Sequence, residues 1–373
     1  MRKIWKAKLL DKVIKSYLFL SRKRVETSLN AEALSPKHIL IFSTTALGDF
    51  LFNTPAIRAV RKRFPDAQIT LVAHEKYADF LKEGNDWNKL VFWNNKAITI
   101  SRVLRSLKGE PPIDIALLLH SHEPYDYLCA ILAGSRLILK DNYRDDIALR
   151  DKWLADYTIA FKGHVIERKL KLVEGLGCDV SDITMKLPFS VENKTANIHP
   201  VIGFQLGAST PERCWAPENF SQLAVLLLKQ FQYLTLVLIG GPGDKGRAET
   251  FLRLLPANLH ARIVNEVGDT SLPQLCRIIN NMDLLVTGDT GPLHIAVTLN
   301  TPTLGLFVTA NPYATGAFQN PDLHHLIYIS RKKSHADLAH VMDVIKPERV
   351  AETAEFILNK IRAETLPEAK VHE

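Results

Sequence analysis

Short apolar segments alternate with amphipathic stretches over two successive parts of the chain. The first part predicts strands at 38–43, 68–73, 89–93 and 113–119 and helices at 53–63, 76–82 and 98–107. The second part predicts strands at 201–206, 234–239, 283–287 and 303–307 and helices near 218–230, 244–255, 271–280 and 292–299. Strands that alternate with helices form parallel sheets covered on both faces, with ligands bound at the carboxyl ends of the strands. We therefore expect an α/β protein with two Rossmann-like domains that face a central cleft.

A polar, proline-flanked stretch at 188–200 separates the two series. It divides the chain into domains at 37–190 and 191–373, and we expect the last helix to pack back on the first domain. Residues 1–36 precede both series and form an arm of a different kind.

The arm has the pattern of a basic amphipathic helix. On a helix, one apolar stripe is formed by Trp5, Leu9, Val13, Tyr17 and Leu20. It is widened by Leu10, Ile14 and Leu18, with lysines opposite. Such a helix suits an anionic membrane surface. The alternative is a helix that packs on its own domain or on a partner while its lysines are simply solvated.

The charge of the chain is concentrated in this arm. The 373 residues contain 47 Lys or Arg and 40 Asp or Glu, a net charge of +7. Residues 1–24 hold nine of the bases and one acid, a balance of +8, which leaves −1 for the rest. A nearly neutral body argues against a nucleic-acid partner, because such proteins carry broad basic surfaces.

The remaining composition is that of an ordinary globular protein. No apolar run reaches the roughly 18 residues that a membrane-spanning helix needs. The four cysteines lie far apart without a CxxC pair, so a zinc site has no support and a reduced, cytoplasmic location is expected.

Asp49 is the candidate catalytic residue of the first domain. It follows the predicted strand 38–43 and a loop of small residues that ends in Gly48. This places its carboxylate at the carboxyl end of the first strand, at the mouth of the expected cleft. The alternative is a structural role as a helix N-cap, which aspartate fills well.

The segment 286–296 has the pattern of an anion site. A strand runs into a Gly/Thr turn, and Pro292 suits the first turn of the helix that follows. The N–H groups at such a helix start bind phosphate readily. Thr290 adds a hydroxyl, and His294 lies about one turn further along on the same side.

Two other loops follow strands of the second domain. The loop at 207–215 carries Arg213, which either neutralises a pyrophosphate or covers Trp215 at the surface. The loop at 240–247 has the glycine spacing of a P-loop but lacks its Lys-Ser/Thr pair. Gly241 and Asp244 stay candidate nucleotide contacts within an ordinary turn.

Four ordered motifs resemble the lipopolysaccharide heptosyltransferase family, glycosyltransferase family 9. They are A-L-G-D with T-P-A-I-R-A-V at 46–60, H-x-x-E-R-x-L-x-L at 164–172, D-T-G-P-x-H-x-A with T-P-T-x-x-L-F at 289–307, and I-x-P-E-x-V at 345–350. Asn300 stands where the family usually has glycine. The resemblance covers about 37–361, so the arm lies outside it.

This resemblance implies a GT-B fold and an inverting, metal-independent transfer of heptose from ADP-heptose to a lipid-linked lipopolysaccharide core acceptor at the inner face of the cytoplasmic membrane. No cofactor is implied. It makes Asp49 the general base, which takes the proton of the attacking hydroxyl. The donor site falls on Ser209, Thr210, Arg213, Asp289, Thr290, Gly291 and His294, with Arg213 in place of the family's usual lysine.

Two other functions stay open on the sequence. The same fold could use another nucleotide sugar for O-antigen or capsule synthesis, or the chain could be a catalytically silent, membrane-associated binding protein. Residues 76–160 carry no motif that identifies the acceptor. His120, His122, Glu123 and Arg144 are candidates for contacting it, and each is equally typical of a surface residue.

Overall fold

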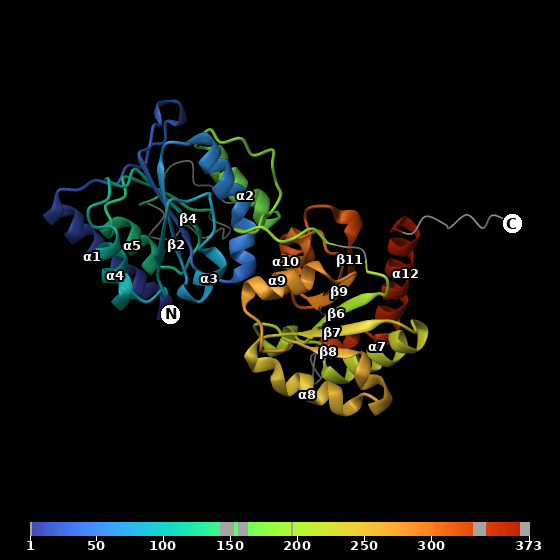
Figure 1. Ribbon diagram of the computed structural model, residues 1–373. Helices are drawn as coiled ribbons and strands as arrows, with labels where there is room; N and C mark the ends of the chain where they lie inside the picture. Colours follow the sequence, from blue (N-terminus) through green and yellow to red (C-terminus); the bar gives the residue numbers. More distant parts are fainter. Residues whose placement is uncertain (1, 142–152, 156–162, 195–196, 331–340, 366–373) are drawn as a thin grey trace. The chain divides into compact units, whose positions relative to one another are not determined.

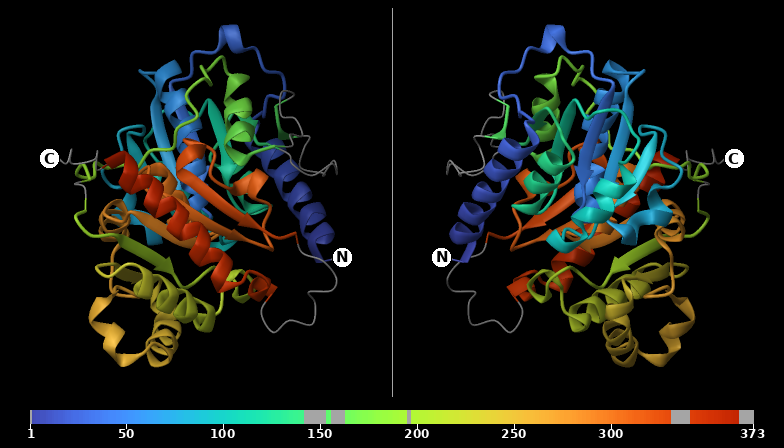
Figure 2. Two further views of the ribbon diagram at one scale, coloured as in Figure 1. Left: turned by 90° about the vertical axis from the view of Figure 1, so that its right-hand side faces the viewer. Right: turned by 90° about the vertical axis from the view of Figure 1, so that its left-hand side faces the viewer.

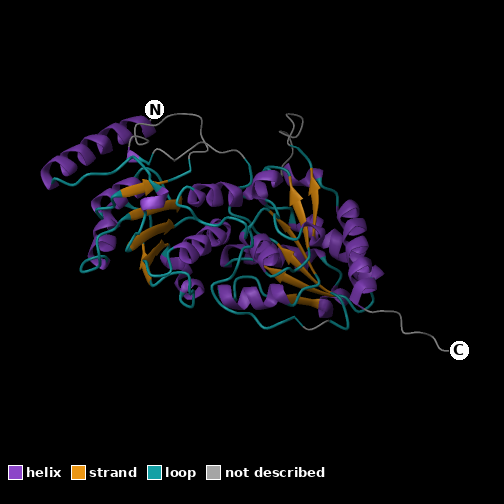
Figure 3. Ribbon diagram, turned by 90° about the horizontal axis from the view of Figure 1, so that it is seen from above, coloured by secondary structure: helices purple, strands orange, loops and turns teal. Residues whose placement is uncertain are grey.

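The computed structural model describes residues 2–141, 153–155, 163–194, 197–330 and 341–365. The chain divides into two compact units, Met1–Phe189 (unit 1) and Ser190–Glu373 (unit 2). Each unit is built on its own parallel sheet with helices packed against it (Figures 1 and 3). The arm belongs to unit 1. Arg144 lies outside the described residues.

The sheet of unit 1 has β1 at its centre, in the order β3-β2-β1-β4-β5, and every neighbouring pair is parallel. The strands are β1 (His38–Ser43), β2 (Gln68–Ala73), β3 (Lys89–Phe92), β4 (Ile115–His120) and β5 (Leu137–Leu139). Ser43 and His120 are paired where β1 and β4 end. Side chains from these two strand ends therefore meet at one edge of the sheet.

Helices cover both faces of this sheet. They are α1 (Arg2–Ser21), α2 (Leu47–Arg63), α3 (Ala78–Leu81), α4 (Ile100–Ser106), α5 (Tyr125–Leu132) and α6 (Val165–Glu174). Helices α2 and α6 pack against each other. The opposite face is covered by α4, α5 and α1, whose apolar side chains join those of β1 and β4 in one core.

Helix α1 divides its apolar side chains between the domain and the solvent. Ile14 is buried in the core of unit 1, and Leu10, Tyr17 and Leu18 pack against the same core. The helix itself lies beside α5 (Figures 1 and 2). Four other described apolar side chains of the helix stay exposed: Leu9 by 54%, Val13 by 46%, Phe19 by 84% and Leu20 by 79%. The predicted single stripe is therefore wrong in detail, because Tyr17 faces the core while its expected neighbours Leu9, Val13 and Leu20 do not.

Helix α2 begins six residues before the predicted start at Asn53, so that Pro55 lies inside the helix and not in its first turn. Proline cannot donate the hydrogen bond that the carbonyl of Leu51 would accept in a regular helix. The hydroxyl of Thr54 donates to that carbonyl instead, at 2.8 Å. The helix therefore continues through the proline and carries its N-terminus back to the end of β1.

Unit 2 has a parallel sheet of six strands in the order β11-β10-β9-β6-β7-β8. The strands are β6 (Val201–Gln205), β7 (Thr235–Ile239), β8 (Ile263–Asn265), β9 (Leu284–Gly288), β10 (Thr303–Phe307) and β11 (His324–Tyr328). The helices are α7 (Pro217–Gln230), α8 (Lys245–Leu254), α9 (Leu272–Asn280), α10 (Gly291–Thr298), α11 (Pro312–Thr315) and α12 (Pro347–Thr365).

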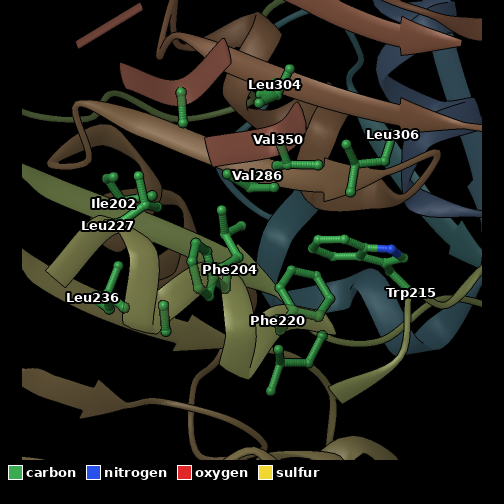
Figure 4. Packing of buried hydrophobic residues seen from close by; sticks show 14 of the residues in the cluster. Ile202, Phe204, Trp215, Phe220, Leu227, Leu236, Val286, Leu304, Leu306 and Val350 are labelled. Atoms are coloured by element: carbon green, nitrogen blue, oxygen red, sulfur yellow. The ribbon is translucent and has the colours of Figure 1, made fainter. Parts of the chain in front are cut away.

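The core of unit 2 lies between its sheet and the helices α7, α8 and α12. Phe204 of β6 packs against Phe220 of α7, and Trp215 lies against the same ring at 4.8 Å between centroids (Figure 4). Val350 of α12 is buried in this cluster. The last helix thus packs on α7 within unit 2, and its expected return to the first domain stays a prediction.

The strands expected from the sequence are all present, within two residues at each end. The edge strands β5, β8 and β11 and the helices α5, α6 and α11 had not been expected. Asn300 follows α10 with a φ of 57°, a left-handed conformation that asparagine tolerates, which explains how it replaces the family's glycine. The four cysteines are free and buried. Among the described residues, no helix is long and apolar enough to span a bilayer.

Candidate active site

Asp49 lies in the first turn of α2, directly after β1. Its Oδ2 accepts hydrogen bonds from the hydroxyl of Thr45 at 2.5 Å and from the backbone N–H of Ala46 at 3.1 Å. The N-cap residue is Ala46, so Asp49 is the third helical residue and not the N-cap that we had considered. Its carboxylate nevertheless binds the loop before the helix. This fixes the side chain at the carboxyl edge of the sheet, one-third exposed.

The loop before Asp49 is held from β3's side of the sheet by Asn95. This residue has a left-handed φ of 62°. Its side chain donates to the carbonyl of Thr44 at 2.9 Å and accepts from the Thr44 hydroxyl at 2.5 Å. The polar loop therefore has a defined shape, which the sequence pattern around Asn95 did not indicate.

His120 and Asn53 lie next to Asp49. Asn53 is one helical turn after Asp49 on α2, and its Oδ1 is 2.8 Å from Nδ1 of His120. The other ring nitrogen of His120, Nε2, is 3.9 Å from Oδ1 of Asp49. The sequence suggested His120 only as an acceptor contact and did not suggest Asn53. The pairing of β4 with β1 is what brings them together.

A buried group of charges lies beneath His120. Lys169 of α6 donates to the carbonyl of Leu119 and to Asp141 at 2.6 Å, and Arg168 pairs with the same carboxylate. Burial by itself would raise the pKa of Asp141, but the cations of Lys169 and Arg168 outweigh it and lower that pKa. Burial first, and then the cation of Lys169, lowers the pKa of His120 to about 3.

The H-x-x-E-R motif therefore has a structural explanation. His164 is the N-cap of α6 and accepts from the N–H of Ile166, while Glu167 accepts from the N–H of His164. Arg168 then reaches Asp141. The motif thus starts α6 and places Arg168 and Lys169 against Asp141, which follows β5.

In unit 2, three of the predicted donor-site residues meet at the end of β9. Asp289 pairs through Oδ2 with Nη1 of Arg213 at 3.1 Å, and its Oδ1 is 3.8 Å from Nε2 of His294. Asp289 and His294 are nearly buried, whereas Arg213 is 40% exposed. The structure thus places a partly exposed guanidinium beside an aspartate that orients it.

Thr290 and Gly291 form the start of α10. Thr290 is the N-cap residue, and its hydroxyl lies 2.9 Å from that of Thr287. Gly291 is the first residue of the helix. Because the N–H groups of a first helical turn have no partner within the helix and the helix dipole is positive there, this end attracts anions.

The loop after β6 brings Arg213 close to β9. Thr210 begins a short 3-10 turn, Pro211–Arg213, and its carbonyl accepts from the N–H of Arg213 at 3.1 Å. A Cβ at Gly288 would lie only 3.1 Å from the carbonyl oxygen of Arg213, so a glycine there allows the loop to approach. Ser209 precedes Thr210 in this loop.

In the loop after β7, the side chain of Asp244 binds the backbone of the loop itself. Oδ2 of Asp244 accepts from the N–H of Gly241 at 2.8 Å, and a Cβ at Gly207 would lie 2.0 Å from the same oxygen. Asp244 therefore joins the turns after β6 and β7. The nucleotide contacts expected of Gly241 and Asp244 stay predictions.

The part of the chain that the structure describes contains no group of three or more His, Cys, Asp or Glu arranged to hold a metal ion. A transfer without a metal ion stays a prediction, to be tested by chelation.

Comparison with known families decides the class of protein. The family described as glycosyltransferase family 9 (heptosyltransferase) matches residues 138–339, more than half of the chain. The chain belongs to glycosyltransferase family 9. It is thus an enzyme of the glycosyltransferase type, and the matched region contains the whole Arg213–Asp289–His294 cluster.

Relatives of family 9 match over most of their length. Lipopolysaccharide heptosyltransferase 3 of Escherichia coli is 25% identical over 279 residues, which are 70% of this chain and 80% of that protein. The structure of a family 9 glycosyltransferase from Veillonella parvula has a TM-score of 0.70 at 22% identity and covers 87% of this chain and 97% of that one. The E. coli ADP-heptose lipopolysaccharide heptosyltransferase II has a TM-score of 0.66 at 20% identity and covers 87% and 100%.

These structural matches confirm the expected fold, two Rossmann-like units of the GT-B heptosyltransferase type. Asp49 and its neighbours in unit 1 precede the region matched by the family. The roles of the individual site residues therefore rest on the geometry described above.

Proposed function

We propose that this family 9 chain transfers a heptose from ADP-heptose to a lipid-linked saccharide of the lipopolysaccharide core, with inversion and without a metal ion. The two named E. coli relatives are lipopolysaccharide heptosyltransferases, and one carries ADP-heptose in its name. The observation that carries the proposal is the position of the Asp49 carboxylate. Its Oδ2 is fixed by hydrogen bonds, and its Oδ1 lies 3.9 Å from Nε2 of His120 at the end of β4.

Asp49 acts as the general base in this reaction. The acceptor hydroxyl gives its proton to the Asp49 carboxylate while its oxygen bonds to the anomeric carbon of the heptose. The bond between that carbon and the diphosphate oxygen breaks, and ADP leaves with the electron pair. Because the oxygen attacks opposite the leaving group, the anomeric configuration inverts.

Unit 2 stabilises the charge that develops on the departing diphosphate. Arg213 supplies a guanidinium held by Asp289, and its planar fork suits phosphate oxygens. The start of α10 at Gly291 adds N–H groups and the positive end of a helix dipole. Such preorganised donors act where charge develops, so no metal ion is required by this arrangement. Ser209, Thr210 and His294 complete the donor site.

The test is an assay of ADP release with ADP-heptose and a Kdo–lipid A acceptor, with the product identified by mass spectrometry. We expect turnover that survives EDTA and falls about 10²- to 10⁴-fold in Asp49→Asn, the range that a general base contributes. Asp66→Asn, an exposed aspartate after the same helix, is the control and should keep full activity. Wild-type turnover by Asp49→Asn would refute the assignment of the base alone.

A donor panel separates this proposal from its alternatives. Thermal stabilisation by UDP- or GDP-sugars and not by ADP-sugars would replace ADP-heptose with another donor. The absence of ADP release and of sugar transfer with every donor would leave a silent binding protein. Transfer of heptose at any rate excludes that second outcome.

We further propose that α1 binds the anionic surface of the membrane in which the acceptor resides. Leu9, Val13 and Leu20 are exposed and lie on one side of the helix, four and seven residues apart. The exposed lysines Lys8, Lys12 and Lys15 lie beside them. An apolar strip flanked by lysines is the pattern of a helix that lies in a membrane interface.

Vesicle sedimentation tests this second proposal. The variant Lys8→Gln/Lys12→Gln/Lys15→Gln should bind vesicles that contain phosphatidylglycerol roughly 100-fold more weakly, because each basic residue near such a surface contributes about 1 kcal/mol. Leu9→Ser/Leu20→Ser should weaken binding as well. Ile98→Ser removes an equally exposed apolar side chain elsewhere in unit 1 and is the control.

Deletion of residues 1–24 is a harsher test, because it also removes Ile14 from the core of unit 1. It should abolish vesicle binding and leave binding of the donor to unit 2 intact. Undiminished vesicle binding by the lysine variant and by the leucine variant would show that α1 only packs on its own domain.

A further inference from the structure

His120 lies between two residues of α2. Its Nδ1 is 2.8 Å from Oδ1 of Asn53, and its Nε2 is 3.9 Å from Oδ1 of Asp49. Asp49 and Asn53 are four residues apart and therefore project from the same side of the helix. The ring is thus anchored on one side and faces the proposed base on the other.

Asn53 determines which nitrogen of the ring carries the proton. Asn53 is fully buried, and its amide Nδ2 donates to the hydroxyl of Ser43 at 2.9 Å, so its Oδ1 is the atom that faces His120. An amide oxygen only accepts hydrogen bonds, so Nδ1 of His120 must donate. In a neutral ring this leaves a lone pair on Nε2, directed toward Asp49.

The surroundings keep this ring neutral at physiological pH. The charged groups that act on it are the cations Lys169 and Arg168 and the carboxylates Asp49 and Asp141. Burial is the largest influence on the pKa of His120, the cation of Lys169 is the next, and both lower it. A neutral imidazole can accept a hydrogen bond at Nε2 but cannot form an ion pair with Asp49.

We propose that His120 is a positioning residue that strengthens Asp49 as a base: its Nε2 accepts a hydrogen bond from the Asp49 carboxyl group once that group has taken the proton of the acceptor hydroxyl. This inference rests on the proposed role of Asp49. The proton passes from the hydroxyl oxygen to Oδ1 of Asp49, is shared with Nε2 of His120, and later leaves to water. No redox partner is involved.

The two oxygens of Asp49 have different tasks in this arrangement. Oδ2 accepts from Thr45 and Ala46, which keeps the side chain in place and favours its charged form. Oδ1 faces the lone pair of His120, which favours the protonated form. The hydrogen bond to His120 exists only after proton transfer, so it stabilises the transition state and not the bound substrate. It therefore acts on kcat.

The first experiment compares His120→Leu with His120→Gln in the transferase assay. Leucine removes both polar contacts, and we expect kcat to fall roughly 3- to 10-fold, about the effect of one hydrogen bond between uncharged groups, with the acceptor KM within about twofold. The acid limb of the pH profile of kcat should move to lower pH, because Asp49 becomes a weaker base. Glutamine can donate to Asn53 and accept from Asp49, so it should restore most of the activity. His260→Leu in unit 2 is the control.

The second experiment reads the ring directly and needs no substrate. Nitrogen-15 NMR of histidine-labelled protein, with the His120 signal assigned by its loss in His120→Gln, should show a neutral ring protonated on Nδ1 at pH 7. A ring protonated on Nε2 would donate to Asp49 in the ground state and would overturn the proposal, even if His120→Leu does not fold.

The outcomes separate this inference from the proposed function. If the wild type turns over, Asp49→Asn is inactive and His120→Leu keeps its kcat and pH profile, this inference alone fails. If Asp49→Asn is active, the base assignment fails and this inference with it. If the wild type does not use ADP-heptose, the donor proposal fails, and the NMR result still decides how His120 faces Asp49.

Discussion

Lys169 is the charged side chain whose replacement should disturb unit 1 most. It is 2% exposed and donates to the carbonyl of Leu119 and to Asp141 at 2.6 Å. Methionine has a similar length and no charge, so Lys169→Met leaves a buried carboxylate with one cation fewer. It also removes the donor that holds the chain directly before His120.

The size of the effect follows from the burial of the pair. Removing one partner of a buried ion pair costs about 3–5 kcal/mol. Arg168 still pairs with Asp141 in the variant, so we expect the lower end, about 3 kcal/mol. Lys171→Met is a matched control on the same helix, because Lys171 and its partner Glu174 are 47% and 41% exposed. An exposed pair contributes about 0.3–0.5 kcal/mol.

Urea unfolding measures the difference. Four of the five tryptophans, Trp5, Trp87, Trp93 and Trp153, belong to unit 1, so tryptophan fluorescence follows mainly this unit. With a slope of about 2 kcal/mol/M, Lys169→Met should lower the midpoint by about 1.5 M and Lys171→Met by less than about 0.3 M. Adding Asp141→Asn to Lys169→Met should recover part of the loss. Equal midpoints for the two single variants would refute the reasoning that burial decides the strength of these ion pairs.

Two further predictions concern a titration and a close approach. Partial burial would raise the pKa of Asp182, but hydrogen bonds from Thr184 and the cation of Arg58 outweigh it and lower that pKa to about 2. The contribution of Asp182 to the free energy of unfolding is therefore complete above about pH 4 and is lost as the pH falls toward 2. The Tm difference between the wild type and Asp182→Asn should therefore narrow from pH 5 to pH 2, and a constant difference would contradict the assignment. Gly288→Ala should push the carbonyl of Arg213 by a few tenths of an ångström and raise the donor KM severalfold. The control is Gly243→Ala, whose Cβ would meet nothing within 4 Å and which should leave the donor KM unchanged. Equal donor KM values for the two variants would show that the close approach of the Arg213 loop to β9 is unimportant.

The sequence alone was sufficient for the central parts of both units. The strands β1, β2, β6, β9 and β10 are mainly apolar, and buried parallel strands have this pattern wherever they lie in the sheet. The segments that directly follow β1, β6 and β9 carry Asp49, Arg213 and Asp289, because ligand-binding residues follow the carboxyl ends of strands. Local pattern and motif spacing contain this information.

Of the four edge strands that the structure describes, β3 was predicted, whereas β5, β8 and β11 were not. β5 and β8 have three residues each, and a segment that short has too few positions to show a period. The predicted start of α2 was too late. Its interior proline, Pro55, is accommodated by a single contact from the hydroxyl of Thr54, which a one-dimensional pattern does not show.

The environment of Asp49 was decided by tertiary structure. Asp49 and Asn53 are close in sequence, but His120 reaches them only because β4 pairs with β1, and Lys169 only because α6 packs beneath that pair. Pairing between distant segments depends on which strands are neighbours, and a one-dimensional pattern does not specify this order.

The basic arm shows the same division between sequence and tertiary structure. Its charge and its wide apolar arc are properties of the sequence, and they predicted a helix with two possible partners. Contact with α5 then placed Ile14 in the core of unit 1 and left Leu9, Val13 and Leu20 exposed beside the lysines. Periodicity determines which side chains share a helix face, but only the packing of that helix against its domain determines which part of the face is buried, because burial requires a complementary surface elsewhere in the chain.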